Sequence, residues 1–381
     1  MPANISNHKC YNSTRFNFLS IRLRGGRIKC SEVRKLNVSY FLGANSGAGF
    51  FSLYDGFCRA DGDFLHLIKA GPGGGKSGFM RRIAEAASAH GYDTECVLCS
   101  GDPDSLDAVY IPEKHIGFVD ATAPHVCEPL HFGFDSDYVN LGRFCAPASD
   151  ERIPRLTEKY RAMYKTAYSY LVAAKSVQEA ELYGAKGADT LEKVRERARG
   201  TAVRRLKSSG GNGTETKRFI RCISCKGEMT LEEDMQKLCK RIYLVDDRME
   251  LADAYLAELL KCARDFGTDT IVCPSPLCPE RLDALVFPQA GLCFAAAPVM
   301  PDVPGARHVR LDALVPPDVS RTLRPALREK EKLSRELLAQ AVHWLGKAKE
   351  YHDELELAYK PHVDFAALDK FTDDYISRLF G

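Results

Sequence analysis

Apolar residues in the first third of the chain form short continuous runs, separated by one segment of helical spacing. The run "DFLHLIKA" (63–70) ends at a cluster of glycines and predicts a buried strand. From Ser77 to His90 the apolar positions recur every three or four residues, which predicts a helix that ends at Gly91. Further runs at 94–99, 108–111 and 115–120 predict three more strands. This order predicts an α/β fold with a mainly parallel sheet.

The pattern from Asp150 to about Lys207 is helical and rich in charge. One apolar stripe runs along it, made of Leu156, Tyr160, Met163, Tyr164, Ala167, Tyr170, Leu171 and Ala174. The basic stretch at 192–207 is either a solvated helix face or an arm that contacts an anion. The next residues, "SSGGNGTET" (208–216), predict a flexible linker.

The chain contains an internal repeat. Residues 66–120 align on residues 242–296 without a gap, a shift of 176 positions, so that "GYDTECV" falls on "GTDTIVC" and "DPDSLDAVYIP" on "CPERLDALVFP". The later helical segments match weakly, "LVAAKSVQEAEL" with "LGKAKEYHDELE". The repeat predicts two copies of one α/β unit, each followed by helices.

The repeat and the linker together divide the chain into predicted parts. Residues 36–207 form the first domain with its helical appendage, and residues 217–381 form the second. Residues 1–35 lack clean periodicity and a continuous apolar segment. We interpret them as a disordered extension or as a wrongly assigned start of the protein.

Composition narrows the class of protein. The chain has 381 residues, of which 45% are hydrophobic and 27% charged, and its formal net charge is +2. A charge so close to neutral gives no strong sign of a nucleic-acid partner, and no apolar run reaches the length of a membrane span. We therefore expect a cytoplasmic protein.

The chain has 14 cysteines, and two pairs have C-x-x-C spacing, Cys96/Cys99 and Cys222/Cys225. The first pair lies on a predicted strand, where residues three apart face opposite sides and do not easily chelate one ion. The second pair lacks an obvious partner pair. Packing thiols in a reducing compartment are the interpretation we favour over a zinc or redox site.

The stretch "AGPGGGKS" (70–77) has the pattern of a phosphate-binding loop. Glycines allow backbone N–H groups to approach phosphates, a lysine reaches the β- and γ-phosphates, and a serine hydroxyl can bind Mg²⁺. The loop follows a predicted strand and opens a predicted helix, whose positive end would face the same anion. The residues predicted to hold the nucleotide are Gly71, Pro72, Gly73, Gly74, Gly75, Lys76, Ser77 and Gly78.

An acidic residue follows the strand predicted at 115–120. Asp120 closes "HIGFVD", which is the Walker B arrangement, with a carboxylate beside the phosphate loop that holds Mg²⁺ through water. Ser77 and Asp120 are therefore the predicted metal residues. Ala121 stands where many hydrolytic proteins of this class place a glutamate as general base, so that any base lies elsewhere.

Two further stretches carry candidate catalytic groups beside Lys76 and Asp120. Asp102 and Asp104, in the loop "CSGDPDSLD" (99–107), could activate a water or a substrate hydroxyl, or could cap a turn. His125, with Thr122, could contact a γ-phosphate or polarise water, or could be a plain loop residue.

The second copy lacks these groups. Its loop positions 246–253 read "DDRMELAD", with no glycine, lysine or hydroxyl at the positions of residues 75–77, and Ala296 replaces Asp120. Asp246 and Asp247 would repel a phosphate. We expect the second copy to keep the fold without binding ATP, and to serve as a docking, regulatory or substrate-holding partner.

The chain resembles a family of bacterial tandem P-loop proteins described only as ATPases or ATP-binding proteins. That family has "GNTA-GF", a G-P-G-x-G-K-S loop, "CSSDPDSLDG", "DGTAPH" and "NLG", and this chain reads "GANSGAGF", "GPGGGKS", "CSGDPDSLDA", "DATAPH" and "NLG". The resemblance covers about residue 36 to the end and implies two tandem P-loop NTPase-like domains. Members of the family usually carry a second intact phosphate loop, and this chain departs from them there.

These observations predict a nucleotide triphosphate ligand with Mg²⁺. ATP is favoured over GTP because no N-K-x-D guanine motif is present. The leading hypothesis is an ATPase that couples hydrolysis to rearrangement of its two domains through an unknown protein or small-molecule partner. The alternatives are a kinase for a nucleoside or other small molecule, and a nucleotide-gated binding protein with little turnover.

Overall fold

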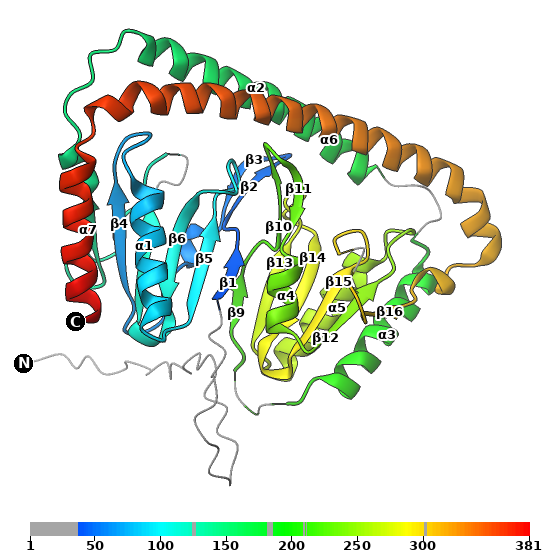
Figure 1. Ribbon diagram of the computed structural model, residues 1–381. Helices are drawn as coiled ribbons and strands as arrows, with labels where there is room; N and C mark the ends of the chain where they lie inside the picture. The colour runs from blue at the N-terminus through cyan, green and yellow to red at the C-terminus, as the bar shows by residue number, and fades with distance from the viewer. Residues whose placement is uncertain (1–36, 124–126, 181–185, 209, 211, 301–302) are drawn as a thin grey trace, which may run out of the picture.

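The computed structural model describes residues 37–123, 127–180, 186–208, 210, 212–300 and 303–381. Two six-stranded sheets stand side by side beneath a pair of long helices (Figure 1). We call residues 37–208 the first half and residues 212–381 the second half. The predicted extension at 1–35 lies outside the described residues.

The first sheet is mainly parallel, as predicted, with one antiparallel strand. Its strand order is β1 (Asn37–Tyr40), β5 (Thr94–Leu98), β6 (Leu106–Ile111), β7 (Ile116–Asp120), β4 (Phe64–Lys69) and β8 (Ser136–Asn140). Strand β6 is antiparallel to both of its neighbours, and the other pairs are parallel. The connections at 99–105 and at the 3-10 turn Pro112–Lys114 are too short for the crossover that parallel neighbours need.

The second sheet repeats the first. Its order is β9 (Glu215–Lys217), β13 (Thr270–Pro274), β14 (Leu282–Phe287), β15 (Leu292–Ala296), β12 (Arg241–Val245) and β16 (Arg307–Val309), with β14 as the antiparallel strand. Helix α1 spans Lys76–Ala89 and its counterpart α5 spans Ala252–Asp265, again 176 positions apart. The predicted internal repeat is therefore confirmed element by element. Strand β9 includes the last two residues of the predicted linker.

Each half also contains a small hairpin that the sequence analysis did not predict. These are β2 (Gly43–Ser46) with β3 (Gly49–Ser52), and β10 (Arg221–Ser224) with β11 (Gly227–Thr230). Ser46 Oγ accepts from Ala48 N, and Ser224 Oγ accepts from Lys226 N, so the two hairpin tips have the same turn. Ala48 and Lys226 therefore hold equivalent positions.

Helix α1 buries the face that its apolar spacing predicts. Phe79, Met80, Ile83, Ala84 and Ala87 are buried against the first sheet. The remaining helices are α2 (Arg152–Glu179), α3 (Ala188–Arg205), α4 (Glu232–Leu238), α6 (Pro317–Tyr359) and α7 (Phe365–Phe380). Within the described ranges, no helix is both long and apolar enough to cross a bilayer.

The long helices α2 and α6 pack along each other across both sheets (Figure 1). Leu156, Ala167, Leu171 and Ala174 of the predicted α2 stripe are buried. Ala167, Leu171 and Ala174 share a core with Leu338, Ala341 and Leu345 of α6. The pair therefore joins the helical appendages of the two halves.

The last helix of each half packs on the sheet of the other half. Helix α3 buries Val194, Ala198 and Ala202 in the core of the second sheet, beside α5. Helix α7 covers α1. The ring centroids of its Phe371 and Tyr375 lie 6.1 and 5.4 Å from the ring centroid of Phe79. Packing therefore crosses the predicted boundary at residue 207.

The two sheets are also joined at their edges. Phe41 and Phe219 exchange backbone hydrogen bonds of 2.9 Å in both directions. Beside them, the guanidinium of Arg218 lies 3.2 Å from the carboxylate of Glu95, and both side chains are largely buried. The halves thus share backbone pairing and a buried ion pair as well as helices.

Candidate functional site

The stretch predicted as a phosphate loop forms the turn between β4 and α1. Gly73 and Gly75 have φ angles of 66° and 83°, in the left-handed region that favours glycine. A Cβ on Gly74 would lie 2.9 Å from the Cβ of Ala70, and a Cβ on Gly75 would overlap the Leu368 side chain. The close fit of this backbone explains why glycines occupy the loop.

Lys76 is the first residue of α1 and reaches back across the loop. Its Nζ donates to the carbonyl oxygens of Ala70 (3.0 Å) and Gly71 (3.1 Å). The same Nζ lies 3.6 Å from Asp120 Oδ2, and the two side chains are 14% and 13% exposed. The ammonium is thus held between the loop and a carboxylate, and it is largely shielded from solvent.

Asp120 occupies the end of β7, next to β4 in the sheet, where it pairs in register with Ile68. Its Oδ1 accepts from the backbone N–H (2.9 Å) and the Oγ1 (2.5 Å) of Thr122. Asp120 Oδ2 faces Lys76. The structure therefore brings together the lysine and the carboxylate that the sequence analysis paired.

The start of α1 offers unpaired donors. Within the described residues, the backbone N–H groups of Gly75, Lys76 and Ser77 have no acceptor, as is usual for a helix N-terminus. Ser77 Oγ accepts from Leu106 N at 2.9 Å. Unpaired amides, a neighbouring ammonium and flexible glycines fit the charge and hydrogen bonding of a phosphate group.

Asp102 and Asp104 lie in the loop after β5, which we call the acidic loop (residues 99–105). Asp102 Oδ2 accepts from Ser105 Oγ at 3.2 Å, and this side chain is 25% exposed. Asp104 is 74% exposed and binds Lys226, whose hydrogen bond lowers the pKa of the Asp104 carboxyl. Asp102 is therefore the better placed of the two to act near a ligand.

His125 and Ala121 follow Asp120 in the chain. His125 lies outside the described residues, so its role stays a prediction. Ala121 is buried, and its N–H donates to the carbonyl of Ile68, so the position after Asp120 offers no side chain for catalysis.

Helices α6 and α7 form a wall beside the phosphate loop, which the sequence did not predict. A Cβ on Gly73 would lie 3.2 Å from the Glu356 carbonyl oxygen. One turn earlier, His352 Nδ1 lies 3.8 Å from Glu356 Oε1, and its ring is 5.4 Å from the ring of Tyr160. The weak match of "LGKAKEYHDELE" in α6 with "LVAAKSVQEAEL", mostly in α2, indicated that the two long helices are equivalent. It did not indicate that α6 lies beside the phosphate loop.

The equivalent loop of the second half is filled by its own carboxylates. Asp247 Oδ1 accepts from Ala252 N at 2.8 Å, at the start of α5, and Asp312 Oδ1 accepts from Met249 N at 3.3 Å. Burial raises the pKa of Asp247 to about 7, although the hydrogen bond from Ala252 opposes the shift. The Asp247 side chain thus pairs with an amide at the start of α5, whereas the equivalent amides at the start of α1 are unpaired within the described residues.

A cavity of about 1050 Å³ lies over this second loop. Its lining includes Asp246, Glu250, Arg281, Arg324 and Arg328. Acidic and basic side chains are mixed along its wall, and Lys330 Nζ already pairs with Glu250 Oε1 at 2.6 Å. The cavity therefore has no single sign of charge that would select a ligand.

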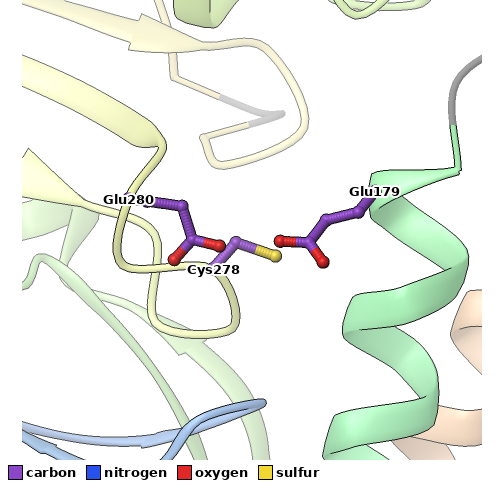
Figure 2. A group of neighbouring side chains, drawn as sticks. All are labelled: Glu179, Cys278 and Glu280. Atoms are coloured by element: carbon purple, nitrogen blue, oxygen red, sulfur yellow. The ribbon is translucent and has the colours of Figure 1, made fainter.

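A carboxylate–thiol cluster lies between the two halves. Figure 2 shows Glu179 of α2 pointing toward Cys278 and Glu280, which lie on a loop of the second half. Lys175 Nζ lies 2.6 Å from Glu280 Oε1, so an ammonium already balances this carboxylate. Burial raises the pKa of the Cys278 thiol to about 11, which keeps it neutral.

The described cysteines are free thiols, and many of them are buried. Neither C-x-x-C pair belongs to a group of possible metal ligands among the described residues. The packing role of these thiols stays a prediction.

Comparison of the chain with protein-family models, with curated proteins and with solved structures finds no match in any of the three. The resemblance to tandem P-loop proteins therefore stays a prediction.

Proposed function

We propose that the first half binds Mg·ATP at residues 71–78 and hydrolyses it, in a cycle that rearranges the two halves. The observation that carries this proposal is a convergence at one edge of the first sheet. Unpaired amides of residues 75–77, the Lys76 ammonium and the Asp120 carboxylate meet there, 3.6 Å separating the last two charges. Ligands of open α/β sheets bind at this edge, beyond the carboxyl ends of the strands.

Each group would have a separate task. Lys76 and the amides at the start of α1 would bind phosphate oxygens. The Ser77 hydroxyl, and Asp120 through water, would hold Mg²⁺, which when bound neutralises charge on the phosphates. Asp102 is the candidate to orient the attacking water, because its loop leads directly to the Leu106 N–H that donates to Ser77.

The proposal is tested by phosphate release from Mg·ATP, with ATP binding measured in the same samples. Lys76→Ala removes the only side-chain cation placed within the loop, and we expect it to abolish turnover and to weaken binding by more than about tenfold. Binding without phosphate release would replace hydrolysis with nucleotide-gated binding. Release that persists unchanged in Lys76→Ala would refute the proposal.

A matched control lies in the second half. Asp246→Ala with Asp247→Asn changes the equivalent loop, which already satisfies its own helix terminus. We expect ATP affinity to stay within about twofold of wild type. Loss of ATP binding in a folded double variant would instead place nucleotide at the second loop.

One observation keeps a kinase as the second candidate. The acidic loop adjoins Ser77, and Ala121 leaves no carboxylate after Asp120 to activate water. A kinase would consume ATP slowly until a hydroxyl acceptor is added, whereas an ATPase would release phosphate without one. Screening nucleosides and small metabolites for accelerated ATP loss separates the two.

A further inference from the structure

Two lysines of the second half reach the acidic loop of the first half. Lys349 of α6 lies 3.5 Å from Asp102 Oδ2, and it also binds Asp353 on its own helix. Lys226, at the tip of the β10–β11 hairpin, binds Asp104. The two carboxylates therefore draw their counter-charges from across the interface between the halves.

The acidic loop is tied in turn to the phosphate loop. Its last residues lead to Leu106, whose N–H donates to Ser77 Oγ at 2.9 Å. Arg81, on the second turn of α1, donates through Nη2 to the carbonyl of Asp104 at 2.5 Å. Any charge left unbalanced on Asp102 or Asp104 would thus act close to the phosphates of a nucleotide.

The interface has two equivalent sides, of which only one adjoins the phosphate loop; we call it the phosphate side. Contacts found on both sides are common to the fold, and contacts found only on the phosphate side are candidates for a role in nucleotide binding. On the other side of the interface, Lys175 of α2 belongs to the first half and takes the place of Lys349, with Nζ 2.6 Å from Glu280 of the second half and 3.4 Å from Glu179 on its own helix. A lysine that bridges a long helix to the opposite loop is therefore common to both sides of the interface.

The other positions differ between the two sides. Cys278 aligns with Asp102, so the cluster in Figure 2 has a neutral thiol where the phosphate side has a carboxylate. Ala48 stands at the position of Lys226, and the tip of its hairpin binds the second half through the backbone, Gly47 N to Leu277 O at 3.0 Å. The additional carboxylate and the additional lysine occur together, and only on the side of the phosphate loop.

We propose that the second half completes the nucleotide site by neutralising the acidic loop, with Lys349 as the main positioning residue and Lys226 as a weaker one. This inference rests on the proposed function. Lys349 and Asp102 are 29% and 25% exposed, whereas Lys226 and Asp104 are 45% and 74% exposed, so the second pair is screened more strongly by water. Docking of the halves would then raise ATP affinity, and by reciprocity ATP would strengthen docking.

The test is the dissociation constant for Mg·ATP in the full chain. We expect Lys349→Gln to weaken binding by about tenfold, the scale of one surface charge left without its partner. Lys175→Gln removes the corresponding lysine from the other side of the interface, so we expect it to stay within about twofold of wild type. Lys349→Arg keeps the charge and should bind like wild type, and thermal unfolding checks that every variant is folded.

The decisive variant is Lys349→Gln with Asp102→Asn. If Lys349 acts by balancing the carboxylate, removing that carboxylate should restore ATP affinity to near the wild-type value. Equal losses in Lys349→Gln and Lys175→Gln, or no rescue by Asp102→Asn, would overturn the inference while ATP binding by the wild type stands. Failure of the wild type itself to bind Mg·ATP would overturn the proposed function, and this inference with it.

Discussion

Single residues distinguish the two loops that precede the equivalent helices α1 and α5. Lys76 stands at the start of α1 with unpaired amides beside it, whereas the Asp247 carboxyl accepts a hydrogen bond from the Ala252 N–H at the start of α5. The sequence predicts that Asp246 and Asp247 repel a phosphate, and repulsion alone would explain a lost site. The structure adds that Asp247 takes up the helix terminus, so that this end of α5 is stabilised without a ligand.

The Asp247 carboxyl makes stability depend on pH. Burial raises its pKa from 3.8 to about 7, so the folded state keeps a proton that the unfolded state releases above about pH 4. Its contribution to stability is full below that pH and is lost as the pH rises to 7. Asp247→Asn keeps the acceptor for Ala252 N without an ionisable group. We expect the unfolding free energy of the variant, relative to wild type, to rise between pH 4 and 8.

The size of this rise is bounded by the pKa shift, up to about 4 kcal/mol. Urea unfolding at pH 4, 6 and 8 measures it, with Asp246→Asn as a control on the adjacent and half-buried carboxylate. A difference between variant and wild type that is constant across this range would show that Asp247 does not hold a proton in the folded protein.

At the scale of elements, the sequence predicts those helices and strands that are determined by local patterns of apolar residues and glycines. The helix at 76–89, its buried face and the strands around it follow from apolar spacing and glycine positions. The direction of β6 does not follow from its own sequence, because a run such as "LDAVYI" is equally compatible with parallel and antiparallel pairing. The short connections on either side of β6 determine its direction. The positions of Lys76 and Asp120 were predictable because the loop and the strand each have a sequence pattern.

The wall of α6 and α7 beside the phosphate loop was not predictable in this way. Glu356, Leu368 and Lys349 lie more than 270 positions from Gly75, and helical periodicity identifies the buried face of a helix without naming its partner. Only the tertiary arrangement shows that these helices of the second half lie beside the loop of the first.

Helix α7 should therefore contribute to the stability of the first half. Leu368 is buried in the core of the first sheet, next to Gly75, while Phe365 on the same helix is 41% exposed. We expect Leu368→Ala to lower the unfolding free energy by about 2–4 kcal/mol, the cost of a core cavity. Phe365→Ala should cost less than about 1 kcal/mol. Denaturant unfolding of both variants tests this, and equal costs would contradict the proposed packing role of α7.

At the scale of the whole molecule, the exchange of α3 and α7 means that neither half completes its own core. The first half ends with a helix that packs on α5, and the helix that covers α1 comes from the end of the chain. The edge pairing of Phe41 with Phe219 and the buried Arg218–Glu95 pair add polar contacts that water would have to replace on separation. The two halves should behave as one folding unit.

This arrangement predicts the behaviour of the separated halves. Residues 37–207 alone would expose Phe79, which Phe371 and Tyr375 normally cover, together with the apolar face of α3. We expect fragments 37–207 and 208–381 to aggregate or to lack cooperative unfolding when produced separately, and to form a soluble one-to-one complex when produced together. Co-purification on a tag attached to one fragment, followed by calorimetry of the complex, measures this. A fragment 37–207 that is monomeric and unfolds cooperatively alone would show that the exchanged helices are dispensable for folding of the first half.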